Sequence, residues 1–297
     1  MTVSSRFTGL IAAPPTPFHA DFSLNLDFVE RQAEKLIADG VSGVFISGST
    51  GEGASMDRGE REQLSVRWCE IARGTPLRVL AHVGCSAQPD AVALAKQAGA
   101  LGVAAVAAYA PYYYRPQSVD TLLDFLVPVA AAAPDTPFFY YHIPIMTGVN
   151  LSMREFLEKA PARIPNLAGL KYTHNDLFEY GELVRDFGER YDLLWGLDEI
   201  LIAARTLGAP GAVGSTYNLA TPTYRKLLAA VDAGQQEEAR ALAHTVQAGV
   251  RSLITGGSVV PALKALLNLG PPRPPMQAIS PEAAEALRER LTEIGYI

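Results

Sequence analysis

Cysteine is scarce in this chain of 297 residues, which contains only Cys69 and Cys85. Neither cysteine belongs to a CxxC pair, so we expect a reducing compartment and no disulfide framework. The sequence also has no HExxH motif and no cluster of histidine and cysteine residues. We therefore expect no bound metal ion.

Long apolar runs and blocks of one charge are missing as well. No run approaches the roughly 20 apolar residues that span a bilayer. The start, "MTVSSRFTGL", lacks the basic and apolar regions of a secretory signal. The 25 basic and 31 acidic residues give a net charge of −6 without a basic block. We expect a cytoplasmic protein that binds neither nucleic acid nor a membrane.

A repeated pattern is present instead: a short apolar run followed by a longer amphipathic stretch. Eight such units occupy about 230 residues, and their apolar runs are nearly continuous, as in parallel strands covered by helices. This pattern predicts an α/β fold, a closed (β/α)₈ TIM barrel. A doubly wound open sheet is the alternative, but "APPTPF" after the first run is not the glycine-rich phosphate turn usual in that fold.

The end of the chain departs from the repeat. We expect residues 1–234 to form the barrel and residues 235–297 to form a helical extension of the same domain. Three helical patterns occupy this extension, within residues 235–257, 259–270 and 280–295.

Polar or glycine-rich segments follow six of the predicted strands. In chain order they are "SGSTGEG", "APYYYRP", "YYHIP", "LKYT", "GLDE" and "GSTYN". In a barrel the strands end at one face, where catalytic residues collect. We therefore expect these segments to form one pocket.

Lys171 differs from the other lysines because it lies in a predicted strand, "LAGLKYT". Strand alternation places it on one face with Leu167, Gly169 and Thr173, and an inward Gly169 leaves room for Lys171 in the barrel mouth. Desolvation there favours the free amine, which forms a Schiff base with a ketone. The alternative is an outward lysine that reaches solvent or pairs with an acid. The other five lysines fall in helical patterns: Lys35, Lys96, Lys159, Lys226 and Lys264.

Two further segments suit chemistry at such a lysine. Small residues in "GSTGEG" let backbone N–H groups converge on an anion, and Ser49 and Thr50 add hydroxyls. In "PFFYYHIP", Tyr141 alternates with Phe139, so its phenol can transfer a proton at the lysine. Each segment also has a structural interpretation, as an ordinary glycine-rich turn and as a core tyrosine.

Together these segments resemble the family of pyruvate-dependent class I aldolases, which includes N-acetylneuraminate lyases and dihydrodipicolinate synthases. The resemblance extends over nearly the whole chain. Its motifs are "GSTGE" (48–52), "YYHIP" (140–144), "GLKYT" (169–173) and "GAVGSTYN" (211–218).

The resemblance implies a role for five residues. Lys171 would form the Schiff base with pyruvate or another 2-keto acid, Ser49 and Thr50 would bind its carboxylate, and Tyr141 would move the proton. Tyr113 would reach into the site of a neighbouring subunit in a homotetramer, although any tyrosine of "YYY" could do so. No metal and no cofactor beyond the covalent Schiff base are implied.

Within the family, the sequence is more similar to the lyases. Met146 stands where the synthases have an arginine for a second carboxylate, while "WGLDE" and "GSTYN" are similar to lyase motifs. This implies cleavage of N-acetylneuraminate, a sugar acid, to N-acetylmannosamine and pyruvate. The residues implied to bind the sugar part are Thr173, Gly196, Asp198, Glu199, Gly214 and Ser215.

Alternatives remain open at this point. Asp198 and Glu199 also suit the start of a helix, as capping residues. The segment "ITGGSVVPALK" does not match the lyases well. The other candidates are an aldolase, synthase or dehydratase acting on a different 2-keto acid, such as a 2-keto-3-deoxy sugar acid aldolase or a dihydrodipicolinate synthase-like enzyme. A non-catalytic keto-acid sensor on the same barrel is a further alternative.

Overall fold

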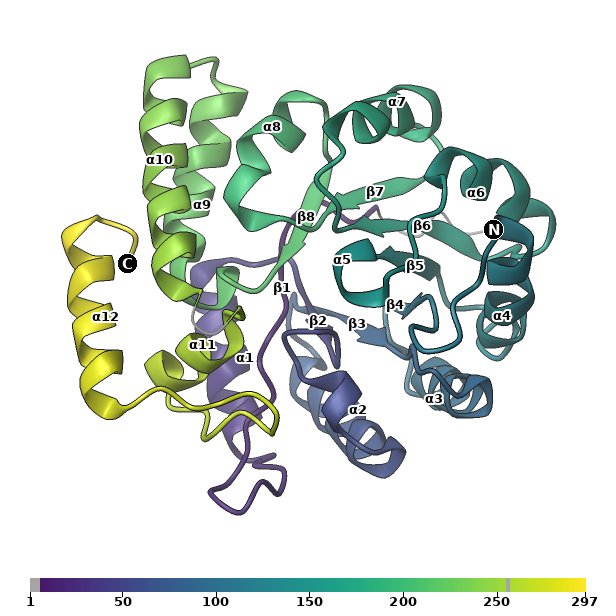
Figure 1. Cartoon of the computed structure of the whole chain (residues 1–297), viewed down its shortest axis with the longest axis horizontal. Coiled ribbons are helices and arrows are strands. Elements are labelled where there is room, and N and C mark those ends of the chain that lie inside the picture. The colour runs from purple at the N-terminus through teal and green to yellow at the C-terminus, as the bar shows by residue number, and fades with distance from the viewer. Residues whose placement is uncertain (1–5, 255–256) are drawn as a thin grey trace.

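The computed structural model describes residues 6–254 and 257–297. Its eight strands form a closed, all-parallel barrel in which each strand pairs with the next and β8 returns to β1 (Figure 1). The predicted (β/α)₈ TIM barrel is confirmed. The strands are β1 (Gly9–Ala12), β2 (Gly43–Ile46), β3 (Arg78–His82), β4 (Ala105–Tyr109), β5 (Phe138–His142), β6 (Leu167–Tyr172), β7 (Asp192–Trp195) and β8 (Gly211–Gly214).

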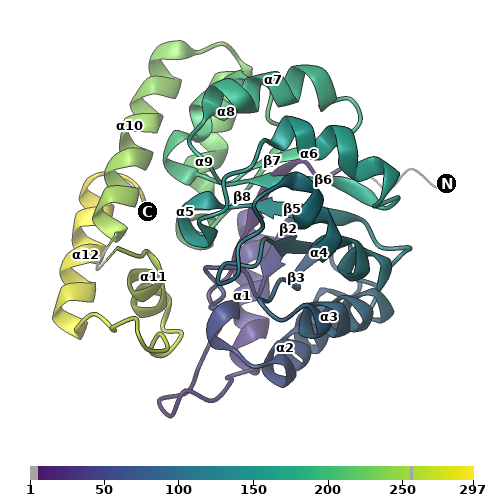
Figure 2. The same ribbon diagram turned by 45° about the vertical axis from the view of Figure 1, so that its right-hand side comes forward.

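Helices surround the barrel, and those that follow the strands cover its outer face (Figures 1 and 2). Short 3₁₀ turns η1 (Gly53–Ser55), η2 (Ala160–Ala162) and η3 (Asp198–Ile200) interrupt the connections. The barrel helices are α1 (Phe28–Asp39), α2 (Arg58–Ala72), α3 (Gln88–Ala100), α4 (Val119–Ala131), α5 (Pro144–Thr147), α6 (Met153–Lys159), α7 (Leu177–Phe187), α8 (Leu201–Thr206) and α9 (Tyr217–Asp232).

Two helical segments differ from the sequence prediction. The turn α5 directly after β5 was not predicted, because one turn of four residues leaves no periodic signal. Helix α9 begins at Tyr217, one turn before the expected start at Thr221. Ala220 has non-helical dihedrals (φ −122°, ψ 27°) just before Pro222. Proline disfavours helical geometry in the residue before it, so the first turn is kinked away from the rest.

The alternation of side chains across the strands divides the core in two. Phe45, Phe139, Tyr141 and Leu194 belong to a cluster of inward side chains, whereas Tyr140 belongs to the larger cluster between strands and helices. Successive residues of a strand point to opposite faces. The predicted opposition of Tyr140 and Tyr141 is therefore confirmed.

One part of the β6 prediction is wrong. Leu167 packs against the outer cluster, and Ala168 packs against the inner one. The pairing register with β5 shifts between Phe138 and Phe139, which pair with Leu167 and Gly169. A bulge adds one residue and reverses the alternation before it. Leu167 therefore does not share the face of Lys171.

Three further helices follow the barrel: α10 (Gln236–Leu253), α11 (Val260–Leu267) and α12 (Pro281–Glu293). They stand together at one side of the barrel (Figures 1 and 2). Tyr296 joins them to it, because its carbonyl accepts from Thr223 Oγ1 (2.9 Å) and its ring fills the space over Gly249. We propose on this basis that residues 235–297 extend the same domain. Residues 255–256 of the first expected segment lie outside the described residues.

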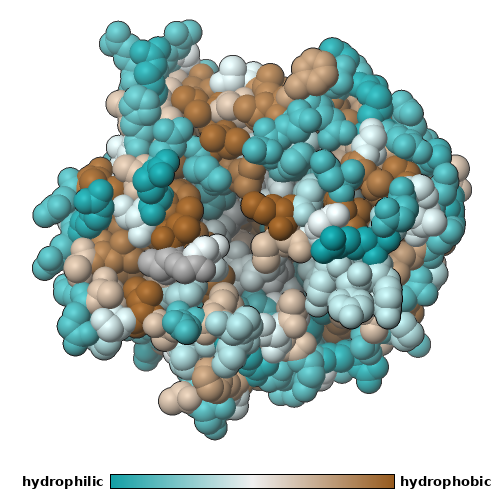
Figure 3. Space-filling model, in the orientation of Figure 1, coloured by the Kyte–Doolittle hydropathy of each residue, from teal (hydrophilic) through white to brown (hydrophobic). Residues whose placement is uncertain are grey.

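The surface shows hydrophobic residues in several separate patches among hydrophilic ones (Figure 3). Within residues 6–254 and 257–297, none of the helices combines the length and the apolar character needed to cross a bilayer.

Candidate active site

Lys171 lies inside the barrel near the carboxyl end of β6. Its side chain is 5% exposed, and its Nζ lies 4.1 Å from the ring centre of Phe45 and 4.0 Å from that of Tyr141. Tyr141 is its register partner across β5 and β6. The predicted inward direction of Lys171 is confirmed, and the other five lysines do lie in helices or at their ends. The amine is thus held in an apolar, aromatic environment beside a phenol.

Gly169 is the residue that makes this packing possible. A Cβ at this position would collide with the carbonyl oxygen of Asp192 on β7 and with the ring of Phe139. Because Gly169 has no side chain, β6 can approach β7 closely, and the Phe139 ring can fill the barrel interior beside it. A larger residue here would push β6 away from β7.

The loop after β2 reaches the same point. The Ser49 hydroxyl lies 3.4 Å from the Tyr141 hydroxyl, and Thr50 beside it is half-buried. The barrel end thus brings Ser49, Tyr141 and Lys171 together, as expected from the sequence.

His82 of β3 packs against Tyr141. The sequence pattern gave no reason to select this residue. Its ring meets the Tyr141 ring edge to face (centres 5.7 Å apart), and its Nδ1 lies 2.9 Å from the Ser47 carbonyl. Burial and the nearby Arg61 guanidinium hold the pKa of His82 well below its usual range. The neutral ring therefore donates from Nδ1 and connects β3 to the loop after β2.

Asp198 links the connection after β7 to the connection after β8. Its Oδ2 accepts hydrogen bonds from the Thr216 N–H (2.9 Å), the Thr216 hydroxyl (2.6 Å) and, at 3.5 Å, the Ser215 hydroxyl. Burial raises the pKa of Asp198, and the Thr216 bonds and the Lys171 charge oppose that rise. Thr216 was missed at the sequence level, although it lies in the quoted "GSTYN".

Two glycines make room for the polar side chains on these strands. A Cβ on Gly214 would collide with the carboxylate of Asp198, and a Cβ on Gly196 would collide with Thr173 Oγ1. That hydroxyl is buried and has no hydrogen-bond partner among the described residues. The two glycines therefore act as space for Asp198 and Thr173, and Thr173 presents an unused hydroxyl.

The capping interpretation of Asp198 and Glu199 is wrong. Both lie in the first turn of η3, whose N-cap is Leu197, and no side chain caps this turn. The Asp198 carboxylate bonds to Thr216 of the next strand connection instead. Glu199 is half-buried, and burial raises its pKa.

Tyr113 does not join this group within its own chain. It is 76% exposed and stacks edge to face on Tyr114, at the rim of a cavity of about 490 Å³ that Phe125 also lines. The ring centre of Tyr112 lies 6.0 Å from that of Tyr109, and the ring centre of Tyr109 lies 6.4 Å from that of Tyr141. Of the three successive tyrosines, Tyr112 is the one that approaches the site of the same chain.

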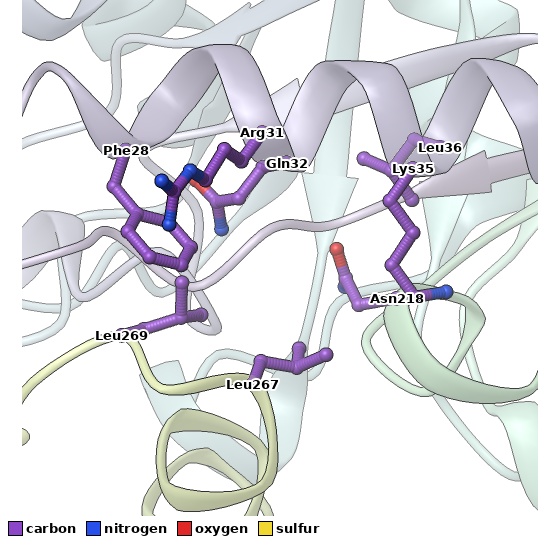
Figure 4. Close-up of a pocket in the computed structure, with 8 residues that line it drawn as sticks. All are labelled: Phe28, Arg31, Gln32, Lys35, Leu36, Asn218, Leu267 and Leu269. Carbon is purple, nitrogen blue, oxygen red and sulfur yellow. The ribbon is translucent and has the colours of Figure 1, made fainter.

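A second cavity, of about 180 Å³, lies outside the barrel between α1, α9 and the chain after α11 (Figure 4). Its walls include Arg31, Lys35, Asn218, Leu267 and Leu269, and none of the predicted site residues lines it. Its location separates it from the group around Lys171.

Among the described residues, no cluster of three or more His, Cys, Asp or Glu side chains could hold a metal ion.

Comparison with known proteins agrees with this geometry. The model of the dihydrodipicolinate synthetase family matches residues 6–294. The N-acetylneuraminate lyase of Xenopus tropicalis is 35% identical over 98% of this chain and 98% of its own length. The solved structure of the Aliivibrio salmonicida N-acetylneuraminate lyase, or sialic acid aldolase, has a TM-score of 0.94 at 36% identity and covers 99% of this chain and 98% of its own.

The Proteus mirabilis N-acetylneuraminate lyase structure gives the same TM-score, 0.94, at 34% identity, over 99% of this chain and all of its own. The resemblance inferred from the motifs is thereby confirmed. Sequence and structure agree over nearly the full length, and the chain belongs to the dihydrodipicolinate synthetase family.

Proposed function

We propose that this protein is a Schiff-base aldolase, a carbon–carbon lyase, which cleaves N-acetylneuraminate to N-acetylmannosamine and pyruvate. The observation that carries the proposal is the Lys171 amine, buried beside Tyr141 in the barrel mouth. The full-length similarity to N-acetylneuraminate lyases supports this substrate over others of the family.

The first half of the reaction builds an electron acceptor. The free amine of Lys171 attacks the C2 ketone of the open-chain substrate and forms a carbinolamine. Tyr141 gives its proton to the departing C2 oxygen, which leaves as water, and a protonated imine remains. The loop with Ser49 and Thr50 binds the carboxylate during this step and orients C2 toward the amine.

The second half breaks the bond between C3 and C4. The deprotonated Tyr141 takes the proton of the C4 hydroxyl, C4 becomes the aldehyde carbon of N-acetylmannosamine, and the bonding electrons move into the imine. The resulting enamine accepts the proton from Tyr141 at C3 and becomes the protonated imine of pyruvate. Water adds to C2 of this imine, pyruvate leaves the free amine of Lys171, and the proton released goes to the Tyr141 phenolate. Lys171 and Tyr141 return to their initial states, and the reaction needs no metal and no separate cofactor.

The sugar part of the substrate would lie across the ends of β6, β7 and β8. The buried hydroxyl of Thr173, unpaired among the described residues, lies against Gly196, and the Asp198 carboxylate lies against Gly214. We expect the sugar hydroxyls to bond to these two groups and to the neighbouring carboxylate of Glu199. Carboxylates accept several hydroxyl hydrogen bonds without a partner charge. Ser215 adds a further hydroxyl beside Asp198.

We also propose a homotetramer in the cytoplasm. Four large apolar side chains are 66–86% exposed: Tyr113 and Tyr114 on the loop after β4, and Ile145 and Met146 in α5. Arg115 covers Gly148 and so joins the loop after β4 to the end of α5. Exposed apolar clusters of this kind favour contact with another subunit, where Tyr113 would enter the partner's site.

The proposed cytoplasmic location has separate support, because both cysteines are free, as expected in a reducing compartment.

The proposed function is tested by two measurements on the wild-type protein. Borohydride reduction in the presence of pyruvate is expected to add one pyruvate-derived group, detected by mass, at Lys171. A panel of 2-keto acids assayed for pyruvate release is expected to favour N-acetylneuraminate. An adduct combined with preference for a shorter keto acid would assign a different aldolase of the family, and the absence of any adduct would favour the sensor.

The proposed binding site for the sugar part of the substrate gives a sharper prediction. Glu199→Ala is expected to lower kcat/KM for N-acetylneuraminate by about 10- to 150-fold, because hydrogen bonds to charged groups contribute about 1.5–3 kcal/mol. Pyruvate trapping should not change, since pyruvate lacks the sugar part. Asp198→Ala should show the same loss and also melt at a lower temperature, because Asp198 holds the β8 connection through Thr216.

The matched control is Asp232→Ala, which removes an exposed carboxylate that pairs with Arg205 away from the site. It should leave both activities unchanged. If Glu199→Ala cleaves N-acetylneuraminate as well as the wild type does, the assignment of this sugar site is wrong.

A further inference from the structure

A fully buried ion pair links the C-terminal helices to the loop after β2. Lys264 Nζ of α11 lies 2.6 Å from Glu52 Oε1, and both side chains are completely buried. Burial lowers the pKa of Lys264 to about 8, while the Glu52 carboxylate opposes that change. With 2.6 Å between the two charged groups and no exposed side-chain surface, the pair is an ionic contact without access to water.

Both members of the pair hold the backbone of neighbouring loops as well. Lys264 Nζ also donates to the Thr16 carbonyl (2.9 Å), and Thr16 Oγ1 donates to the Gly51 carbonyl (2.6 Å). Glu52 Oε2 accepts the backbone N–H of Arg273 (2.7 Å). The loop after β1, the loop after β2 and the C-terminal extension therefore meet at this pair.

The Arg273 side chain makes a second attachment on the same loop. Its guanidinium pairs with Glu60 at the start of α2 (Nη1 to Oε2, 2.7 Å) and donates to the Ser55 carbonyl (2.7 Å). Residues 52–60 are thus held at both ends by the chain that follows α11. Neither attachment involves a group that the proposed reaction uses.

The loop needs external support because of its backbone. Ser47 and Glu52 have φ values of 56° and 55°, in the left-handed region that non-glycine residues rarely adopt. Such conformations persist where surrounding contacts maintain them. Ser49 and Thr50 lie between these two residues, and Ser49 approaches the Tyr141 hydroxyl.

We propose that Glu52 and Lys264 are positioning residues, which hold loop 47–53 in the shape that binds the substrate carboxylate. This inference rests on the proposed function for the ligand of the loop. It gives the C-terminal extension a role in substrate binding, although α11 contributes no group to the reacting atoms. The sequence pattern predicts only that Lys264 lies in a helix, because its partner Glu52 is 212 positions away.

The test uses Glu52→Gln and Lys264→Met, singly and combined, in the full chain. A single replacement leaves the other charge buried without its partner, which destabilises strongly, whereas the double replacement is neutral and of similar size. The double variant is therefore the informative one. Arg273→Met is a milder variant that loses the Glu60 and Ser55 contacts and keeps the backbone N–H bond to Glu52.

Two readouts are expected to change in the double variant. Amide hydrogen exchange in residues 47–57 should become about 10-fold faster or more, while exchange in β7 stays unchanged. The pyruvate concentration that gives half-maximal borohydride trapping should rise by about 10-fold or more. A loop in which Ser47 and Glu52 no longer keep their left-handed backbone conformation binds the carboxylate less well. At saturating substrate, kcat should stay close to the wild-type value, since Lys171 and Tyr141 are untouched.

The control is Lys159→Met, the same substitution at a surface lysine that pairs with Asp120 and Glu155. It should change neither readout. Arg273→Met should shift both readouts in the same direction as the double variant, by a smaller factor. A lower melting temperature with wild-type exchange in residues 47–57 and wild-type pyruvate affinity would overturn the proposal, because the pair would then only stabilise the fold.

The hydrogen-exchange readout needs no ligand. If the wild-type protein traps no pyruvate, the proposed function fails, and the exchange result still decides whether the pair shapes the loop. Exchange that accelerates in the variants but leaves pyruvate affinity unchanged would contradict the role in carboxylate binding.

Discussion

Lys171→Met is expected to abolish both pyruvate trapping and cleavage of N-acetylneuraminate, to the limit of detection. The amine is the only part of this residue that can form the imine, and without the imine the electrons released on C–C cleavage have no acceptor. Methionine has a similar length and can pack on the rings of Phe45 and Tyr141 that the lysine now covers. Turnover and the mass of the borohydride-reduced protein are the measurements.

The stability of the Lys171→Met protein should be equal to or above that of the wild type. A side chain that is 5% exposed inside the barrel carries a desolvated amine, and replacing it with a thioether removes the cost of burying a polar group. Lys96→Met, on the outside of the barrel in α3, is the matched control and should keep full activity. A trapped adduct that persists in Lys171→Met and maps to another lysine would contradict the assignment.

The barrel and the meeting of Lys171, Tyr141 and Ser49 at its mouth could be predicted because their signals are local. Eight apolar runs with helical patterns between them specify the strand order, and strand ends collect at one face of a parallel barrel. Lys171 was recognisable because no other lysine falls in a strand. Tyr141 followed from alternation along β5, which has no bulge on its own side of the pairing.

The parts that could not be predicted depend on contacts between distant segments. The bulge that turns Leu167 outward arises from the register between β5 and β6, and no single strand contains that information. Thr216 binds Asp198 across 18 positions, and Lys264 reaches Glu52 across 212. The helix-cap interpretation of Asp198 failed for the same reason, since local spacing suits a cap and the carboxylate instead bonds to Thr216 in the connection after β8.

Tyr141→Phe is expected to lower kcat by about 10²–10⁴-fold, the usual contribution of a general acid–base group. The replacement removes only the hydroxyl. The ring keeps its edge-to-face contacts with Phe45 and His82, and the one hydrogen bond lost, to Ser49, is long at 3.4 Å. The melting temperature should therefore change little. Pyruvate trapping should persist at long incubation but build up more slowly, because the departing C2 oxygen loses its proton donor.

Tyr140→Phe is the matched control for this loss. Tyr140 is the neighbour of Tyr141 on β5, is equally buried, and faces the helices, where its ring packs on Phe156. The same atom is removed from the same strand, yet the kcat of Tyr140→Phe should remain near the wild-type value.

Exchange of the pyruvate methyl protons with deuterated water gives an independent readout, since it requires the enamine step and not the sugar. Unchanged kcat and unchanged exchange in Tyr141→Phe would move the proton transfer to Thr50 or to Tyr113 of a neighbouring subunit. Loss of both in Tyr141→Phe alone would place it on the inward phenol of β5.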